Sequence, residues 1–103
     1  MYNTVLTAQQ KAIEYLKSSI VNHQSSILAK KVDQIARDYI IKQGFPTIPH
    51  SLGHGIGIEV HEPPRLSATS KEILKPGMVF SIEPGIYLPA GRQGLPSYGG
   101  VRI

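Results

Sequence analysis

The sequence contains no cysteine and no tryptophan in its 103 residues. Without cysteine, the chain can form neither a disulfide nor a thiolate metal site. No apolar run is long enough to cross a bilayer. The opening residues also lack the basic segment and apolar core of a signal peptide. We therefore expect a small, single-domain protein in the cytoplasm, with no membrane partner.

Basic residues outnumber acidic ones, with eleven Lys and Arg against seven Asp and Glu, which gives a formal charge of +4. These basic residues are scattered, and only Lys30 and Lys31 are adjacent. A nucleic-acid-binding surface normally shows a more clustered pattern. We therefore expect no nucleic-acid partner.

The first part of the chain has the periodicity of two helices. Residues 4–20 carry one apolar face at spacings of three and four, made of Val5, Leu6, Gln9, Ala12, Ile13, Leu16 and Ile20. Residues 21–29 are more polar and are predicted to be a connection, in which His23 is an exposed histidine without a role.

A second helix is predicted at residues 31–43. Its buried stripe is expected to be Val32, Ile35, Ala36, Tyr39 and Ile40. Asp33 is expected in the first turn, where the helix dipole favours a negative charge. Lys42 is expected in the last turn, and Gly44 should end the helix.

Strand and turn patterns dominate after Pro49. Residues 56–60 alternate as in a strand, which Pro63 and Pro64 should end. A polar loop at 65–75 and a Pro-Gly turn at 75–77 precede a mostly buried strand at 78–83. Shorter strands are expected at 86–88 and 101–103, with a loop at 89–100 between them. The predicted class is α+β, two helices followed by an antiparallel sheet, with residues 1–44 helical and residues 45–103 rich in strands.

Three of the four histidines fall between residues 50 and 62, together with three glycines. The four-residue spacing of His50 and His54 would suit a helical zinc site, but the intervening and flanking glycines disfavour a helix. His54 and His61 are an odd number of residues apart, so in a regular strand they would face opposite sides. A glycine bulge could bring them together, and spacing alone leaves this open.

Glu83 follows an otherwise apolar segment. A carboxylate there either points into solvent or is partly buried and paired with a cation. Both alternatives remain open from the pattern alone. No Gly-x-Ser-x-Gly elbow and no cysteine nucleophile is present. A hydrolytic metal site is therefore the better chemical hypothesis, and imidazole with carboxylate suits Mn, Fe, Co or Zn.

Three segments, together with the two predicted helices, resemble one peptidase family. These segments are His50–Pro63, Leu74–Tyr87 and Gly100–Ile103. They resemble the Xaa-Pro dipeptidases, aminopeptidase P and the methionine aminopeptidases, which share the pita-bread fold. The resemblance implies a partial pita-bread fold and a partial catalytic domain at residues 1–103. It also implies an enzyme that hydrolyses peptide bonds before proline with metal-activated water.

The resemblance implies metal ligands at His54 and Glu83, within a complete family site that binds two divalent ions, usually Mn or Co. It assigns substrate contact to His50 and His61, and His61 would also assist proton transfer.

Arg102 matches an arginine that orients a ligand, and Tyr87 matches a position near the site. The substrate would be a peptide with proline at its second position, and a homodimer is compatible with the resemblance.

The family uses five protein ligands, and the resemblance matches only two of them here. Asp33 and Asp38 do not match the two aspartates, and the last ligand would directly follow Ile103. We therefore expect the isolated chain to be inactive and its metal occupancy to be doubtful. The alternative hypothesis is a non-catalytic binding module for protein partners, as in relatives that have lost their ligands.

Overall fold

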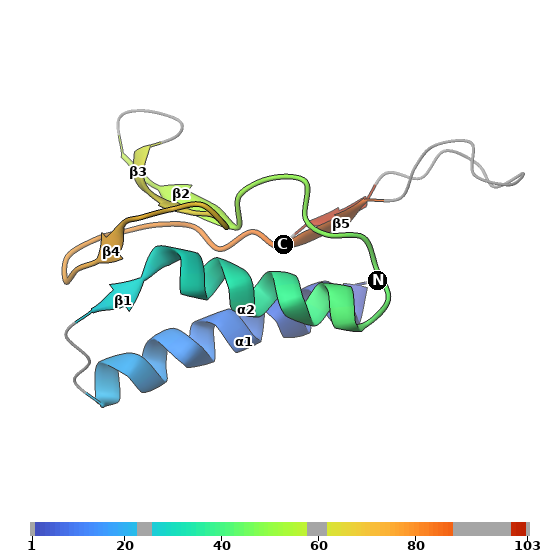
Figure 1. The fold of residues 1–103 in the computed structure, drawn as a ribbon, viewed down its shortest axis with the longest axis horizontal. Helices are drawn as coiled ribbons and strands as arrows, with labels where there is room; N and C mark the ends of the chain where they lie inside the picture. The colour runs from blue at the N-terminus through green and yellow to red at the C-terminus, as the bar shows by residue number, and fades with distance from the viewer. Residues whose placement is uncertain (1, 23–25, 58–61, 88–99, 103) are drawn as a thin grey trace, which may run out of the picture.

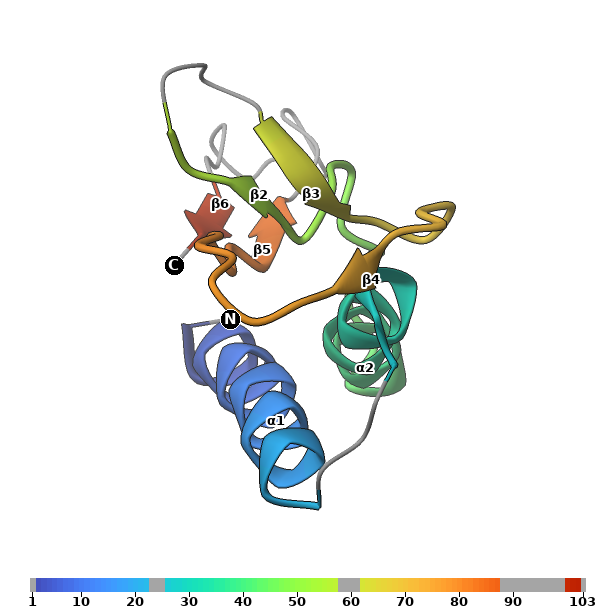
Figure 2. The same ribbon diagram turned by 90° about the vertical axis from the view of Figure 1, so that its left-hand side faces the viewer.

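Two antiparallel helices pack side by side beneath the strands (Figures 1 and 2). The computed structural model describes residues 2–22, 26–57, 62–87 and 100–102. The helices are α1 (Tyr2–Val21) and α2 (Ala29–Lys42). The strands are β1 (Ile27–Leu28), β2 (Gly53–Gly55), β3 (Glu62–Leu66), β4 (Ile73–Leu74), β5 (Gly85–Tyr87) and β6 (Gly100–Arg102). Within these ranges, neither helix has the combination of length and apolar character that crossing a membrane requires.

The predicted first helix is confirmed, but its apolar face ends differently. The fully buried positions on α1 are Val5, Ala8 and Ala12, and the face continues to Ser19, which is 2% exposed. Ile20 was expected in this face but is 64% exposed. Adjacent residues of a helix lie about 100° apart around its axis, so Ser19 occupies the inward position and Ile20 turns away.

The second helix begins earlier than its periodicity predicts. Residues 27–29 were expected in a connection, yet Ile27 and Leu28 form β1 and Ala29 starts α2. The backbone N–H of Ala29 donates to Glu72 O at 3.0 Å, so an otherwise unpaired first-turn donor is satisfied. Asp33 therefore lies beyond the first turn, and the dipole role expected for it is wrong. It is fully buried instead.

The predicted end of α2 and the predicted Pro-Gly turn are confirmed. Lys42 occupies the last turn, and Gly44 follows at φ 88°, with its N–H donating to Ile41 O. Gly77 also has φ 88°, and the N–H of Met78 donates back to Lys75 O at 3.3 Å. Such positive φ values favour glycine.

The strands form three two-stranded antiparallel sheets, β1–β4, β2–β3 and β5–β6. The predicted α+β class is thus confirmed, with the antiparallel pairing divided among three pairs. In β2–β3, His54 pairs with Arg65, and the register shifts between His54 and Gly55. The extra residues of this irregularity are Pro63 and Pro64 of β3, so it is not formed by the glycines. The convergence of His54 with His61 stays a prediction, because His61 lies outside the described residues.

The two prolines expected to end a strand lie inside one. Pro63 and Pro64 are part of β3 and are joined by a cis peptide bond. They fall between the paired residues Glu62 and Arg65, where the register is irregular. Proline lacks an N–H, so it is tolerated at such a position. Of the predicted strand at 56–60, Ile56 lies just beyond β2 and is 57% exposed, and residues 58–60 lie outside the described ranges.

The segment at 78–83 is not the mostly buried strand that its apolar residues predict. Met78 and Val79 are 38% and 63% exposed, and the segment forms only an isolated bridge to β2. Its backbone nevertheless runs beside residues 52–56. The N–H groups of Ser81 and Glu83 donate to His54 O and Leu52 O at 2.8 and 2.6 Å. This pairing places Glu83 next to β2.

Gly53 allows the segment to approach closely. A Cβ at Gly53 would lie 1.8 Å from Ser81 O, a distance that no real side chain could occupy. The predicted strand at 86–88 is confirmed for Ile86 and Tyr87, which lie in β5, and Leu88 is outside the described residues. The strand expected at 101–103 is confirmed for Val101 and Arg102, which lie in β6, and Ile103 is outside the described residues.

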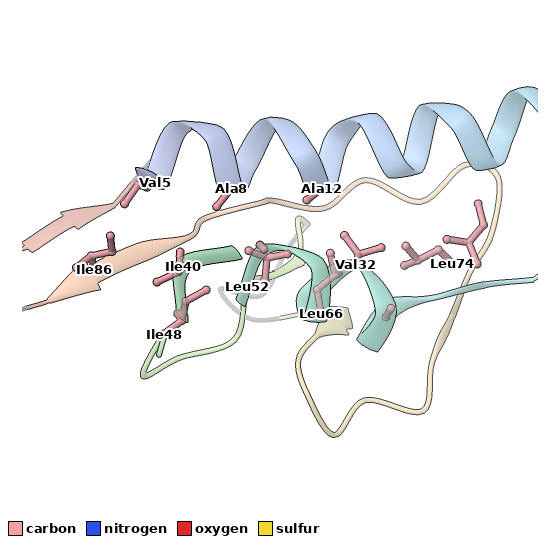
Figure 3. Close-up of a cluster of buried hydrophobic side chains, with 13 residues drawn as sticks. Val5, Ala8, Ala12, Val32, Ile40, Ile48, Leu52, Leu66, Leu74 and Ile86 are labelled. Atoms are coloured by element: carbon pink, nitrogen blue, oxygen red, sulfur yellow. The ribbon is translucent and has the colours of Figure 1, made fainter. Parts of the chain in front are cut away.

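One hydrophobic core connects the helices to the strands (Figure 3). Val5, Ala8 and Ala12 of α1 face the core, as do Val32 and Ile40 of α2. The strand-rich part contributes Ile48, Leu52, Leu66, Leu74 and Ile86. Because Leu52 directly precedes β2 and Ile86 lies in β5, core packing fixes the two segments that carry the candidate site.

Candidate active site

His54 and Glu83 meet across the pairing of β2 with residues 78–83. The distance from His54 Nε2 to Glu83 Oε2 is 2.9 Å. Both side chains are partly buried, at 29% and 31% exposure. Of the two alternatives for Glu83, the structure therefore bears out a partly buried, paired carboxylate and not one that points into solvent.

Both ring nitrogens of His54 face oxygen acceptors. Nδ1 lies 2.9 Å from Gly55 O, and Nε2 faces the Glu83 carboxylate. A neutral imidazole carries only one N–H. At most one of these two contacts can therefore be a hydrogen bond donated by a neutral ring, and the other nitrogen has a lone pair that could bind a metal ion. A carbonyl that accepts from Nδ1 is also how metal-binding histidines are commonly oriented.

Three groups around Glu83 favour its charged form. The Ser81 hydroxyl donates to Glu83 Oε2 at 2.7 Å and lowers the pKa of Glu83 below its ordinary value. Burial acts in the opposite direction, and the charges of His54 and Arg102 lower this pKa further. Arg102 Nε lies 3.8 Å from Glu83 Oε1 and is largely exposed. The carboxylate is therefore ionised near neutral pH and suited to binding a cation.

His50 is held differently. Its Nδ1 lies 2.7 Å from Ser51 O, and its Nε2 lies 2.9 Å from the Tyr87 hydroxyl. A neutral ring donates from Nδ1 to the carbonyl and accepts at Nε2 from the hydroxyl. The two rings also meet edge to face, with centroids 5.5 Å apart. Unlike His54, His50 therefore contacts a carbonyl and a hydroxyl and no carboxylate.

A cavity of about 350 Å³ connects these residues. His50, His54, Glu83 and Arg102 line it. Charged and polar groups of β3 and the following loop line it as well, namely Glu62, Arg65 and Glu72. Four of the six predicted site residues therefore share one cavity, and Tyr87 reaches it through its hydrogen bond to His50.

His61, the remaining predicted site residue, lies outside the described residues. Its assigned contact with substrate and its part in proton transfer remain predictions. Among the residues that the structure describes, no group of three or more His, Cys, Asp or Glu side chains is arranged to hold a metal ion. Imidazole and carboxylate are donors that fit a divalent metal ion, so His54 and Glu83 could form a part of its ligand set.

Sequence reasoning missed two residues that support the site. Ser81 lies two residues before Glu83 on an extended segment, so the two side chains share one face. That spacing could have identified it. Arg37 lies four residues after Asp33 on α2, a spacing at which helical side chains meet. The backbone atoms that Arg37 also contacts could not be read from the sequence.

Comparison with known proteins places the whole chain in one family. The model of metallopeptidase family M24 matches residues 1–103. An Xaa-Pro dipeptidase of Pyrococcus horikoshii is 46% identical over 104 residues, which cover 100% of this chain and 26% of that protein. The chain thus spans about a quarter of the length of the curated relatives it matches.

Solved structures give the same result for the fold. A prolidase from Pyrococcus furiosus matches with a TM-score of 0.74 and 42% identity, covering 99% of this chain and 26% of that one. A methionine aminopeptidase from Rickettsia prowazekii has a TM-score of 0.65 at 19% identity, covering 97% of this chain and 44% of that one, and shares the fold alone. The expected partial pita-bread fold is confirmed by these neighbours. With its family model matched from end to end, the chain belongs to metallopeptidase family M24.

Proposed function

We propose that the chain forms part of the catalytic domain of a metal-dependent peptidase that hydrolyses Xaa-Pro bonds. One observation carries this proposal. Both nitrogens of His54 face acceptors, and one acceptor is the ionised carboxylate of Glu83. A histidine oriented by a carbonyl at one nitrogen, with a carboxylate beside the other nitrogen, is a donor pair suited to binding a metal ion. The neighbouring His50 contacts the Ser51 carbonyl and the Tyr87 hydroxyl instead of a carboxylate, which supports different roles for the two histidines.

In this proposal, His54 Nε2 and the Glu83 carboxylate are two ligands of a site for two divalent ions, Mn or Co. Ions bound there would polarise the scissile carbonyl and activate the attacking water. Ser81 and Arg102 hold the Glu83 carboxylate in its charged form.

The substrate side of the cavity is assigned to His50, which Tyr87 orients through its hydroxyl. His61 would contact the substrate and move a proton at the reacting centre, an assignment that rests on the family resemblance. The proposed substrate is a peptide with proline at its second position. This follows the names of the relatives, which are Xaa-Pro dipeptidases and a prolidase. A cytoplasmic location and a homodimer remain predictions.

The test of this function uses a host-carried chain, in which residues 1–103 replace the matching segment of the Pyrococcus horikoshii Xaa-Pro dipeptidase. Metal is removed with a chelator, and Mn²⁺ or Co²⁺ is added back. Hydrolysis is then compared for an Xaa-Pro dipeptide and the same dipeptide with alanine in place of proline. We expect metal-dependent hydrolysis of the Xaa-Pro dipeptide. Hydrolysis of the alanine dipeptide should be at least about tenfold slower, the size of effect that a binding pocket gives between two similar apolar side chains.

The unmodified host and the isolated 103-residue chain are the two controls. We propose that the isolated chain is inactive with either metal, because two described ligands cannot fix two ions. A folded host-carried chain without peptidase activity would contradict the proposed function and favour the binding-module alternative. Hydrolysis by the isolated chain would contradict the proposal that its ligands are too few for activity.

A further inference from the structure

A partly buried ion pair on α2 binds the backbone that leads into the site. Asp33 is fully buried, and its carboxylate receives a two-pronged contact from Arg37. Arg37 Nε donates to Oδ2 at 2.9 Å, and Nη2 donates to Oδ1 at 3.0 Å. A bidentate pair of this kind has a defined geometry as well as a charge. The guanidinium is therefore held in one orientation.

The remaining donors of Arg37 bind the segment at residues 47–50. Nη1 donates to Ile48 O at 2.5 Å and to the Thr47 hydroxyl at 3.0 Å. Nη2 donates to His50 O at 3.1 Å. A guanidinium has five N–H donors in a fixed planar fork, and the five contacts match that number. A lysine has three donors on a single nitrogen and could not reproduce this pattern.

Asp33 also binds the backbone of this part of the chain. Its Oδ1 accepts the backbone N–H of Leu52 at 3.2 Å. The pair thus binds backbone atoms of Ile48, His50 and Leu52, three alternate residues of the segment before β2. Those contacts lie directly before β2, which carries His54.

We propose that Asp33 and Arg37 are positioning residues for the substrate side of the active site. They act on His50 through its backbone and hold its imidazole where the Tyr87 hydroxyl reaches Nε2. The pair touches neither substrate nor metal in this account. The proposal rests on the proposed function for its kinetic consequence, but the orientation of His50 can be measured without any activity.

The first measurement uses the host-carried chain with ¹⁵N-labelled histidine. The His50 imidazole nitrogens are compared in the wild type, Arg37→Lys and Asp33→Asn. Tyr87→Phe serves as the reference, because it removes the hydroxyl that donates to His50 Nε2. We expect Arg37→Lys and Asp33→Asn to move the Nε2 resonance toward its position in Tyr87→Phe. Lys31→Met and Asp38→Asn are matched controls on exposed positions of α2 and should leave it unchanged.

The second measurement separates KM from kcat for the Xaa-Pro dipeptide. We expect Arg37→Lys to raise KM about tenfold, the lower end of what loss of an orienting partner costs, with kcat within about threefold of wild type. Loss of a purely structural contact would instead lower the active fraction, so kcat would fall with KM unchanged.

The two measurements fail independently. If the wild-type host-carried chain has no activity, the proposed function fails, and the imidazole resonances still decide the positioning role. An unchanged His50 resonance in folded Arg37→Lys and Asp33→Asn would overturn the proposal. Because Asp33 is buried, Asp33→Asn could unfold the chain, and Arg37→Lys, which keeps the charge, then decides alone.

Discussion

Replacing Glu83 with glutamine in the host-carried chain is expected to lower kcat/KM for the Xaa-Pro dipeptide by about a thousandfold. Glutamine keeps the size of the side chain and an oxygen that can accept from Ser81, but it removes the charge that faces His54. Metal-ion polarisation contributes several kcal/mol to such reactions, and each 1.36 kcal/mol is tenfold in rate. The affinity for Mn²⁺, measured by calorimetry, should fall in the same variant.

The matched control is Glu14→Gln, which makes the same change at an exposed position of α1. It should leave both activity and Mn²⁺ affinity unchanged. His54→Ala should behave like Glu83→Gln in both measurements, because each removes one of the two proposed ligands. Normal Mn²⁺ affinity in either variant would show that these side chains do not hold the ion.

Replacing Arg37 with methionine is expected to lower the free energy of unfolding of the 103-residue chain by about 3–5 kcal/mol. The variant leaves the Asp33 carboxylate fully buried without its cationic partner, and breaking a buried pair from one side has a cost of this size. Urea denaturation followed by circular dichroism measures the change. At a slope of about 1.5 kcal/mol per molar urea, the midpoint should fall by about 2–3 M.

Lys31→Met is the control for this experiment, because it removes a cation from an exposed position of the same helix. Exposed substitutions of this kind usually change stability by no more than about 0.5 kcal/mol. Adding Asp33→Leu to Arg37→Met should recover part of the loss, since the uncompensated buried charge is then gone. Equal effects of Arg37→Met and Lys31→Met would refute the importance of the buried pair.

The helices were predictable from the sequence because their signal is local. Repeated apolar spacing marked α1 and α2, and Gly44 marked the end of α2. The segment at 78–83 was not predictable in the same way. Its apolar residues indicate burial, but Val79 is exposed and the backbone pairs with residues 52–56, far away in the sequence. No local pattern reports such a partner.

The site was only partly accessible to sequence reasoning. Spacing identified the histidine cluster but left the convergence of its members open, and the pattern around Glu83 was compatible with either solvent or a cation. Family resemblance assigned His54 and Glu83 to one site, and in the structure His54 Nε2 lies 2.9 Å from Glu83 Oε2. The function of Arg37 was not visible, because its partners are backbone carbonyls whose positions depend on the folded chain.

The most direct test is a crystal structure of the Mn²⁺-loaded host-carried chain with an anomalous difference map at the manganese edge. The account predicts a manganese peak about 2.0–2.3 Å from His54 Nε2 and from a Glu83 carboxylate oxygen, typical distances for such ligands. His50 should remain bound to Tyr87 and take no part in coordination. Manganese bound elsewhere, with His54 Nε2 still in direct contact with Glu83, would contradict the assignment of these two residues as ligands.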